Sequence, residues 1–142
     1  MYRYLLFVLL VLPAAQLNAA DIITLYKQAY QQAVTDRISE QLTAEYRKLG
    51  VSDEQITKNI AHITGRMANC QVQMFENYEA RYVETAYSVT ANGGSLDQSN
   101  KAIEEQMSRD VASGAITEEQ LGSMVANGIN FVQACTAKIF NK

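Results

Sequence analysis

The sequence predicts an all-α protein: a four-helix assembly built from two tandem, related helical hairpins and joined by one disulfide bond. After residue 20 the chain has no proline, and Ala, Glu, Gln, Leu and Met are plentiful, which favours helix. Apolar residues recur every three or four positions between Ile56 and Met74, as expected for one helical face. The two cysteines, Cys70 and Cys135, lie 65 residues apart, and the segments around them align at that offset.

Residues 1–20 have the order of a secretory signal peptide. Arg3 supplies the positive start, Leu5 to Leu12 is an unbroken apolar run, and small residues lead to a cleavage site after Ala19 or, as we favour, Ala20. The run is too short for a bilayer span, although an uncleaved N-terminal anchor is the alternative. We therefore expect an exported protein of the periplasm, with secretion beyond it left open.

The mature chain, residues 21–142, is long enough for one domain with one core. It carries all 15 acidic residues, and loss of Arg3 makes its charge one unit more negative than the −3 of the whole chain. The basic residues are scattered, so nucleic acid and anionic membranes are poor partners. In an oxidising compartment, Cys70 and Cys135 predict one intrachain disulfide, and we expect a monomer or a weak homodimer.

The elements follow in order along the chain. A first helix is expected from about Ile22 to the turn at Gly50, and a second starts with Ser52 as cap and Gln55 reaching back. This second helix is expected to run past Tyr82 towards Val89. A linker at about 90–95 follows, with Ser95 and Gln98 as a further capping box.

The second half of the chain repeats the first. Residues 38–75 and 103–140 align without gaps and share eight identities, among them the two cysteines and the pair Phe75 and Phe140. The start at Ser52 to Gln55 returns as Thr117 to Gln120. We interpret the chain as a duplicated hairpin of helix, glycine-containing turn and capped helix.

Residues for catalysis or metal binding are sparse. His62 is the single histidine, and it is expected to be structural, because no nucleophile is marked near it. Haem and zinc are not expected, because the haem attachment motif and a ligand cluster are missing. Adjacent acidic pairs such as Asp53–Glu54 fit the first turn of a helix better than a pair of catalytic acids. We expect no catalytic, cofactor or metal site.

Aromatic residues give the one candidate binding surface. Two aromatic groups fall at helical spacing: Tyr26 with Tyr30, and Phe75 with Tyr78 and Tyr82. Either these faces pack on each other at one end of the bundle, or they form a tyrosine-rich groove for a protein or peptide partner. Packing of the faces on each other is the favoured interpretation. The second unit has no counterpart to Tyr78 and Tyr82, and this asymmetry keeps the groove as the alternative.

Val132 to Thr136, with the sequence VQACT, resembles the stretch around one cysteine of the small periplasmic acid-stress chaperones of the HdeA type. Those proteins are also exported, helical and held by one disulfide. The resemblance covers five residues and transfers no functional residue to this chain.

The function expected from these features is a non-enzymatic binding role. The candidate classes are an inhibitor, an immunity protein, a chaperone or an envelope accessory protein, with a periplasmic protein or peptide as partner. The alternative is a small periplasmic hydrolase that uses acidic residues no motif reveals.

Overall fold

The computed structural model describes residues 19–140, and this part of the chain is almost entirely helical. The predicted all-α fold with one disulfide is confirmed. The elements are α1 (Ala19–Lys48), α2 (Asp53–Met74), the 3₁₀ turn η1 (Phe75–Asn77), α3 (Ala80–Ala91), α4 (Leu96–Ala112) and α5 (Glu118–Phe140). The predicted signal peptide lies outside the described residues, apart from Ala19 and Ala20, which open α1. None of the described helices is long and apolar enough to cross a membrane.

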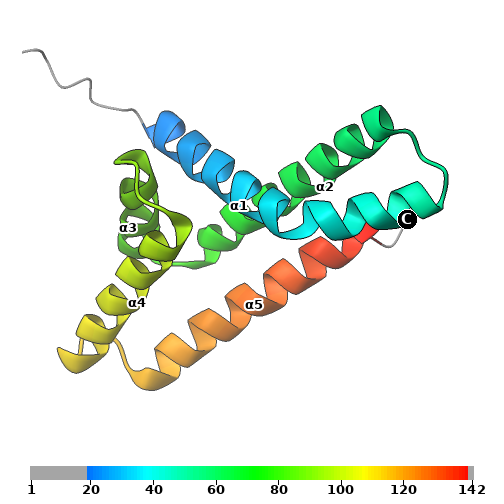
Figure 1. Cartoon of the computed structure of the whole chain (residues 1–142). Coiled ribbons are helices and arrows are strands. Elements are labelled where there is room, and N and C mark those ends of the chain that lie inside the picture. Colours follow the sequence, from blue (N-terminus) through cyan, green and yellow to red (C-terminus); the bar gives the residue numbers. More distant parts are fainter. Residues whose placement is uncertain (1–18, 141–142) are drawn as a thin grey trace, which may run out of the picture.

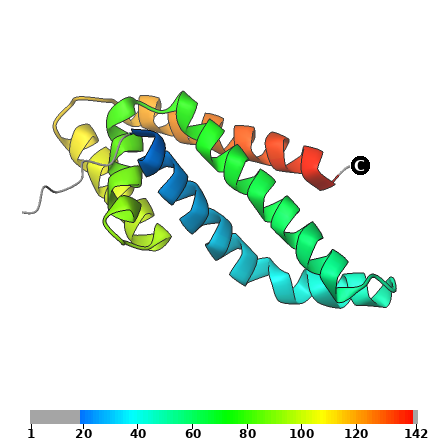
Figure 2. The same cartoon turned by 90° about the horizontal axis from the view of Figure 1, so that it is seen from above.

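The helices form an elongated, open arrangement (Figures 1 and 2). α1 and α2 pack on each other as an antiparallel hairpin, and their connecting turn lies at one end of the molecule. The α3–α4 pair lies at the opposite end, where α3 packs on α1. α5 starts at the α3–α4 end and runs back along α2. The start of α1 is thereby placed beside α3.

The predicted helix starts are present at Ser52, Ser95 and Thr117. The Ser52 hydroxyl accepts a hydrogen bond from the Gln55 backbone N–H at 3.4 Å, whereas the Gln55 side chain turns away and bonds to Asn59. Ser95 forms the full capping box that its sequence predicts, in which each partner's side chain bonds to the other's backbone. Thr117 and Gln120 bond in the same reciprocal way.

The second predicted helix is shorter than expected. It does not run on past Tyr82: α2 ends at Met74, η1 follows, and Tyr78 and Glu79 adopt extended backbone before α3 begins. The break separates aromatic residues that one continuous helix would place on a single face. Phe75 enters a cluster with residues of α1, while Tyr82 reaches α4 and donates a hydrogen bond of 2.7 Å to Asp110. Packing of the two rings against different helices accounts for a break that no proline or glycine marks.

The helices of the second half pair differently from those of the first. The predicted linker forms the turn between α3 and α4, and these two helices pack closely, whereas α4 and α5 touch mainly near their connection. The repeat itself remains a prediction. It agrees with one piece of geometry: Cys70 and Cys135 each lie 17 residues after the first residue of their helix.

The hydrophobic core lies where α1, η1, α3, α4 and the start of α5 meet. Tyr26 and Tyr82 are fully buried there, and Met107 and Ile116 close the side formed by α4 and the turn after it. Asp110 is also buried, with the Tyr82 hydroxyl at 2.7 Å and the Arg81 guanidinium at 3.1 Å from the same carboxylate oxygen. This polar contact connects α4 to α3. It also gives the buried carboxylate the hydrogen-bonding and charged partners that burial of such a group requires.

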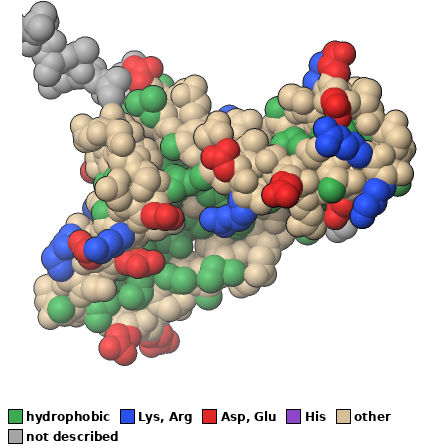
Figure 3. All heavy atoms as spheres, in the orientation of Figure 1, with side chains coloured by type: hydrophobic (Ala, Val, Ile, Leu, Met, Phe, Trp, Pro, Cys, Tyr) green, Lys and Arg blue, Asp and Glu red, His purple; other side chains and the backbone are tan. Residues whose placement is uncertain are grey.

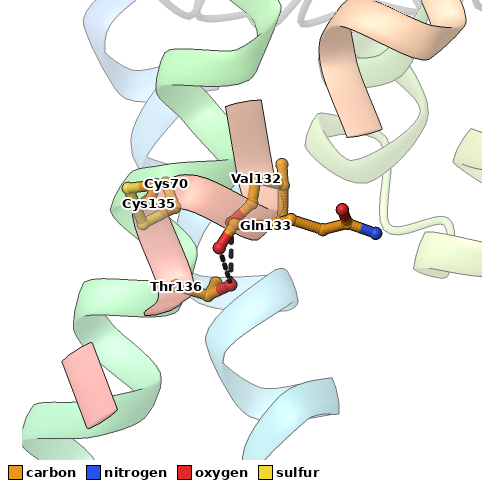
Figure 4. The surroundings of a disulfide bond; sticks show 5 residues. All are labelled: Cys70, Val132, Gln133, Cys135 and Thr136. Carbon is orange, nitrogen blue, oxygen red and sulfur yellow. Dashed lines mark hydrogen bonds between the residues drawn. A yellow bond between two sulfur atoms is a disulfide. The ribbon is translucent and has the colours of Figure 1, made fainter. Parts of the chain in front are cut away.

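The predicted disulfide joins α2 to α5 near the C-terminal end of each helix. The Cys70 and Cys135 Cα atoms are 5.8 Å apart, and Cys70 is buried (Figure 4). Beside the bond, the Thr136 hydroxyl donates to the Val132 carbonyl of its own helix at 2.7 Å. The two helices run antiparallel, so the bond links equivalent positions of two oppositely directed helices.

Candidate functional site

An apolar groove between the start of α1 and the outer side of α3 is the strongest candidate site. We call it the α1–α3 groove; its volume is about 530 Å³. Seven of its ten lining residues are apolar or aromatic. The lining residues are Ile22, Ile23, Phe75, Glu76, Tyr78, Ala80, Val83, Glu84, Tyr87 and Ser88.

Aromatic rings form the base of the groove. Phe75 and Tyr87 are almost completely buried, with ring centroids 5.6 Å apart in an edge-to-face contact. Tyr26 lies behind both, 5.4 Å from Phe75 and 5.0 Å from Tyr87. Such mutually packed rings have little freedom to move, and pairs of this kind add stability beyond the area they bury. The base is therefore a rigid apolar surface.

The walls come from three different elements. α1 contributes Ile22 and Ile23, of which Ile23 is 37% exposed, and α3 contributes Val83 one turn before Tyr87. Tyr78 stands between them, with its ring 5.8 Å from Phe75 in an edge-to-face contact. Tyr78 also packs against α5 at Gly128, where a side-chain Cβ would come within 2.6 Å of the phenol oxygen. The absence of a side chain at Gly128 therefore leaves the space that the Tyr78 ring occupies.

The rim of the groove is acidic. Glu76 of η1 and Glu84 of α3 line it and are both exposed. The ion pairs formed within residues 19–140 use neither of these carboxylates, whereas the nearby Glu79 is paired with Arg81 at 2.8 Å. Two carboxylates beside an apolar surface favour a ligand that combines apolar groups with a positive charge.

The phenols around the groove are held in their neutral form. Burial raises the pKa of Tyr26 and Tyr78, and a hydrogen bond from Gln71 only partly offsets the effect at Tyr26. The pKa of Tyr87 is raised by burial first and by the nearby charge of Glu76 second. The base of the groove therefore stays uncharged at neutral pH, and the negative charge is confined to the rim.

The five aromatic residues predicted as a partner surface have different positions. Tyr26, Phe75 and Tyr82 are at most 5% exposed, so they belong to the core, in line with the interpretation that the sequence favoured. Phe75 still contributes to the base of the groove. Tyr30 and Tyr78 keep partly exposed surface, and Tyr78 lies in the groove wall while Tyr30 stacks on Tyr26 outside it.

Sequence reasoning missed Ile22, Ile23, Val83 and both rim carboxylates. Ile22 continues the i+4 series of Tyr26 and Tyr30 backwards by one turn, so that series held a signal for it. The sequence held no such signal for Glu76 and Glu84, because the helix break at 75–79 decides which side of α3 faces α1. Their positions depend on tertiary packing.

A larger, polar groove of about 610 Å³ runs between α1 and α2. Two of its polar side chains hold the helices together: Gln31 donates to the Ala61 carbonyl at 3.2 Å, and Thr35 donates to the Thr64 hydroxyl at 3.1 Å. An exposed ion pair between Arg47 and Asp53 lies at its end. These contacts tie the hairpin together, so we do not take this groove as the candidate site.

Within the described part of the chain, no three His, Cys, Asp or Glu side chains are grouped to hold a metal ion. His62 is exposed on α2, and the α1–α3 groove is lined by none of the histidine or cysteine side chains.

Comparison of the chain with protein-family models, with curated proteins and with solved structures finds no match.

Proposed function

We propose that the protein is exported to an oxidising compartment and acts there as a non-enzymatic binding protein. Its α1–α3 groove binds an apolar segment of a protein or peptide that is flanked by a basic residue. The observation that carries this proposal is the combination of a rigid apolar base with carboxylates at the rim. Apolar side chains would supply affinity through burial, and a lysine or arginine beside them would meet Glu76 and Glu84.

Export is the second part of the proposal. Arg3, the apolar run Leu5 to Leu12 and the small residues before Asp21 support a cleaved signal peptide. A disulfide is compatible with an oxidising compartment such as the periplasm. Cleavage after Ala20 would make Asp21 the new N-terminus, directly before the groove residues Ile22 and Ile23.

A pair of labelled peptides tests the groove. One peptide carries two leucines four residues apart followed by a lysine, and the other has glutamate in place of the lysine. Fluorescence anisotropy should detect binding of the lysine peptide, and the glutamate peptide should bind at least about fivefold more weakly. Raising the salt concentration should narrow that difference, because exposed charges are screened.

Matched variants locate the binding. Ile23→Lys should weaken binding of the lysine peptide at least about tenfold, since it places a positive charge on the apolar wall. Leu49→Lys, at a residue 77% exposed in the α1–α2 turn, serves as control and should change nothing. Glu76→Gln with Glu84→Gln should abolish the preference for lysine over glutamate. Binding that survives Ile23→Lys unchanged, or no binding of the lysine peptide, would contradict the proposal.

A further inference from the structure

Tyr78 connects the α1–α3 groove to α5. It lines the groove, and its ring lies against the backbone of Gly128, where a Cβ atom would come within 2.6 Å of the phenol oxygen. Tyr78 has extended backbone between η1 and α3, so the position of its ring depends on neighbours such as Phe75 and Gly128. A movement of α5 at Gly128 therefore reaches a wall of the groove.

α5 has few attachments to the rest of the fold. Its first two turns touch the core, and its buried residues are Gly128 and Ile139. Cys135 lies seven residues after Gly128 and four before Ile139, so the three share one face of the helix. On the face seen in Figure 3, hydrophobic side chains remain at the surface along α5. The disulfide bond is therefore the firmest attachment of the second half of α5.

The surroundings of the disulfide bond suit attack by a thiol. A cavity of about 210 Å³ beside the bond is lined by both cysteines, of which Cys135 is half-buried and Cys70 is 3% exposed. Arg66 of α2 and Lys138 of α5 line the same cavity, and the ion pairs formed within residues 19–140 use neither of them. Two cations beside the sulfur atoms attract an attacking thiolate and stabilise the thiolate that leaves.

We propose that a dithiol reductant controls peptide binding in the α1–α3 groove by opening the Cys70–Cys135 bond. Reduction frees the second half of α5 from α2, Gly128 withdraws from the Tyr78 ring, and the groove loses a fixed wall. The peptide then binds more weakly, because ordering Tyr78 costs part of the binding free energy. This regulation rests on the function proposed above. In an oxidising compartment the bond is formed, so the groove is competent until a dithiol reaches the cavity.

The exchange proceeds in two steps. A thiolate of the dithiol attacks the Cys135 sulfur, the bond to the Cys70 sulfur breaks, and Cys70 leaves as a thiolate. The second thiolate of the dithiol then attacks the sulfur that its own molecule has bound to Cys135, and Cys135 leaves in turn. The dithiol becomes a disulfide and gives two electrons to the two cysteines. The two protons that it releases are taken up, through solvent, by the cysteine thiolates.

Reduction of the folded protein is measured first. Dithiothreitol, a small dithiol, is added to the oxidised protein, and the thiols formed are alkylated and counted by mass spectrometry. The rate should change less than about twofold in about 1 M urea. A rate that rises more than about fivefold would mean that the bond reacts only in unfolded protein, and would overturn the proposal.

Matched charge variants locate the point of attack. Arg66→Gln with Lys138→Gln should slow reduction by dithiothreitol at least about threefold. Lys58→Gln with Lys101→Gln removes the same charge at two exposed lysines elsewhere and should leave the rate unchanged. Equal rates for the two double variants would overturn the assignment of this cavity.

The lysine peptide reports on the groove itself. Its dissociation constant should be at least about fivefold higher for the reduced protein than for the oxidised protein, and residues 75–79 should exchange amide hydrogens faster after reduction. Equal affinity for the two forms would overturn the regulation and leave the proposed function standing. Failure of the oxidised protein to bind the peptide would refute the proposed function, and the regulation with it.

A pair of glycine variants tests the contact with the bond intact. Gly128→Ala crowds the Tyr78 ring and should weaken peptide binding by the oxidised protein at least about threefold. Gly122→Ala makes the same change in the same helix, where nothing lies within 4 Å of the added Cβ, and should leave the affinity unchanged. Equal affinity in these two variants would overturn the proposal.

Tyr78→Ala separates the regulation from general unfolding. It removes the ring through which the bond acts, so reduction should change the affinity of this variant less than about twofold. Circular dichroism checks that the reduced proteins stay folded. A reduced protein that has unfolded would lose binding in Tyr78→Ala as well, and that result would overturn the proposal.

Discussion

Loss of the Cys70–Cys135 bond should lower the free energy of unfolding by about 4 kcal/mol. The bond closes a loop with a sequence separation of 65 residues. In the chain-entropy model, such a loop restricts the unfolded chain by an amount close to that figure. For a domain of this size the melting temperature should fall by about 15 °C. Cys70→Ala is the suitable change at the buried position, because it leaves no unsatisfied hydroxyl behind.

Thermal and urea unfolding followed by circular dichroism measure the effect. Cys70→Ala alone and the double variant with Cys135→Ala should agree closely, because either one opens the same loop. Hydrogen exchange should then show which part of the fold loses stability. The second half of α5, residues 129–140, should exchange fastest after the bond is removed, since α5 fully buries only Gly128 and Ile139.

Two outcomes would refute this reasoning. A melting temperature lowered by only a few degrees would mean that packing alone holds α5 on α2. A large loss of stability without faster exchange in residues 129–140 would mean that the bond supports another part of the fold.

Three further predictions concern single side chains. Gly122→Ala should stabilise the monomer by about 0.5–1 kcal/mol, whereas Gly128→Ala should be less stable than Gly122→Ala by about 1–3 kcal/mol, because its Cβ would lie 2.6 Å from the Tyr78 phenol oxygen. Urea unfolding at low micromolar concentration compares the two, and equal stabilities would contradict the contact. Burial raises the pKa of Tyr82 to about 12. The stability that this phenol contributes is therefore complete below pH 10 and is lost as the pH rises to 12. Tyr82→Phe should reduce the pH dependence of the unfolding free energy between pH 10 and pH 12 by about one proton, and an unchanged slope would contradict this prediction. Ser95→Ala should cost about 1 kcal/mol through loss of the α4 cap, measured by thermal unfolding, and no change would show that the capping box contributes little.

The features that sequence reasoning found are those encoded locally. Ser95 and Gln98 form their capping box as expected, because the motif needs only the residues it contains. The disulfide followed from two cysteines in a chain expected to be exported, and its partners could not be confused because the sequence contains only two cysteines. Residues at helical spacing, such as Tyr26 and Tyr30, were correctly placed on a helix.

The features it missed depend on contacts between distant segments. Phe75 and Tyr82 are seven residues apart, which suits one helical face, yet they are buried against different helices and the chain breaks between them. The same break turns Val83 towards Ile22 to form the groove. No sequence pattern marks Asp110 as buried, and its burial depends on Tyr82 and Arg81 from α3. No local pattern carries such information.

The fold buries little of α5, and this explains both the value of the disulfide and the exposure of Ile129 and Phe140. α2 has nearly the same length and buries five residues, because it packs on α1 as well as on α5. α5 packs mainly on α2 and on the turn that follows it, and it buries two of its 23 residues. A covalent bond fixes the position of a helix that packing alone holds weakly, yet it covers none of the helix surface. The bond can therefore keep α5 in place although Ile129 and Phe140 stay exposed on it.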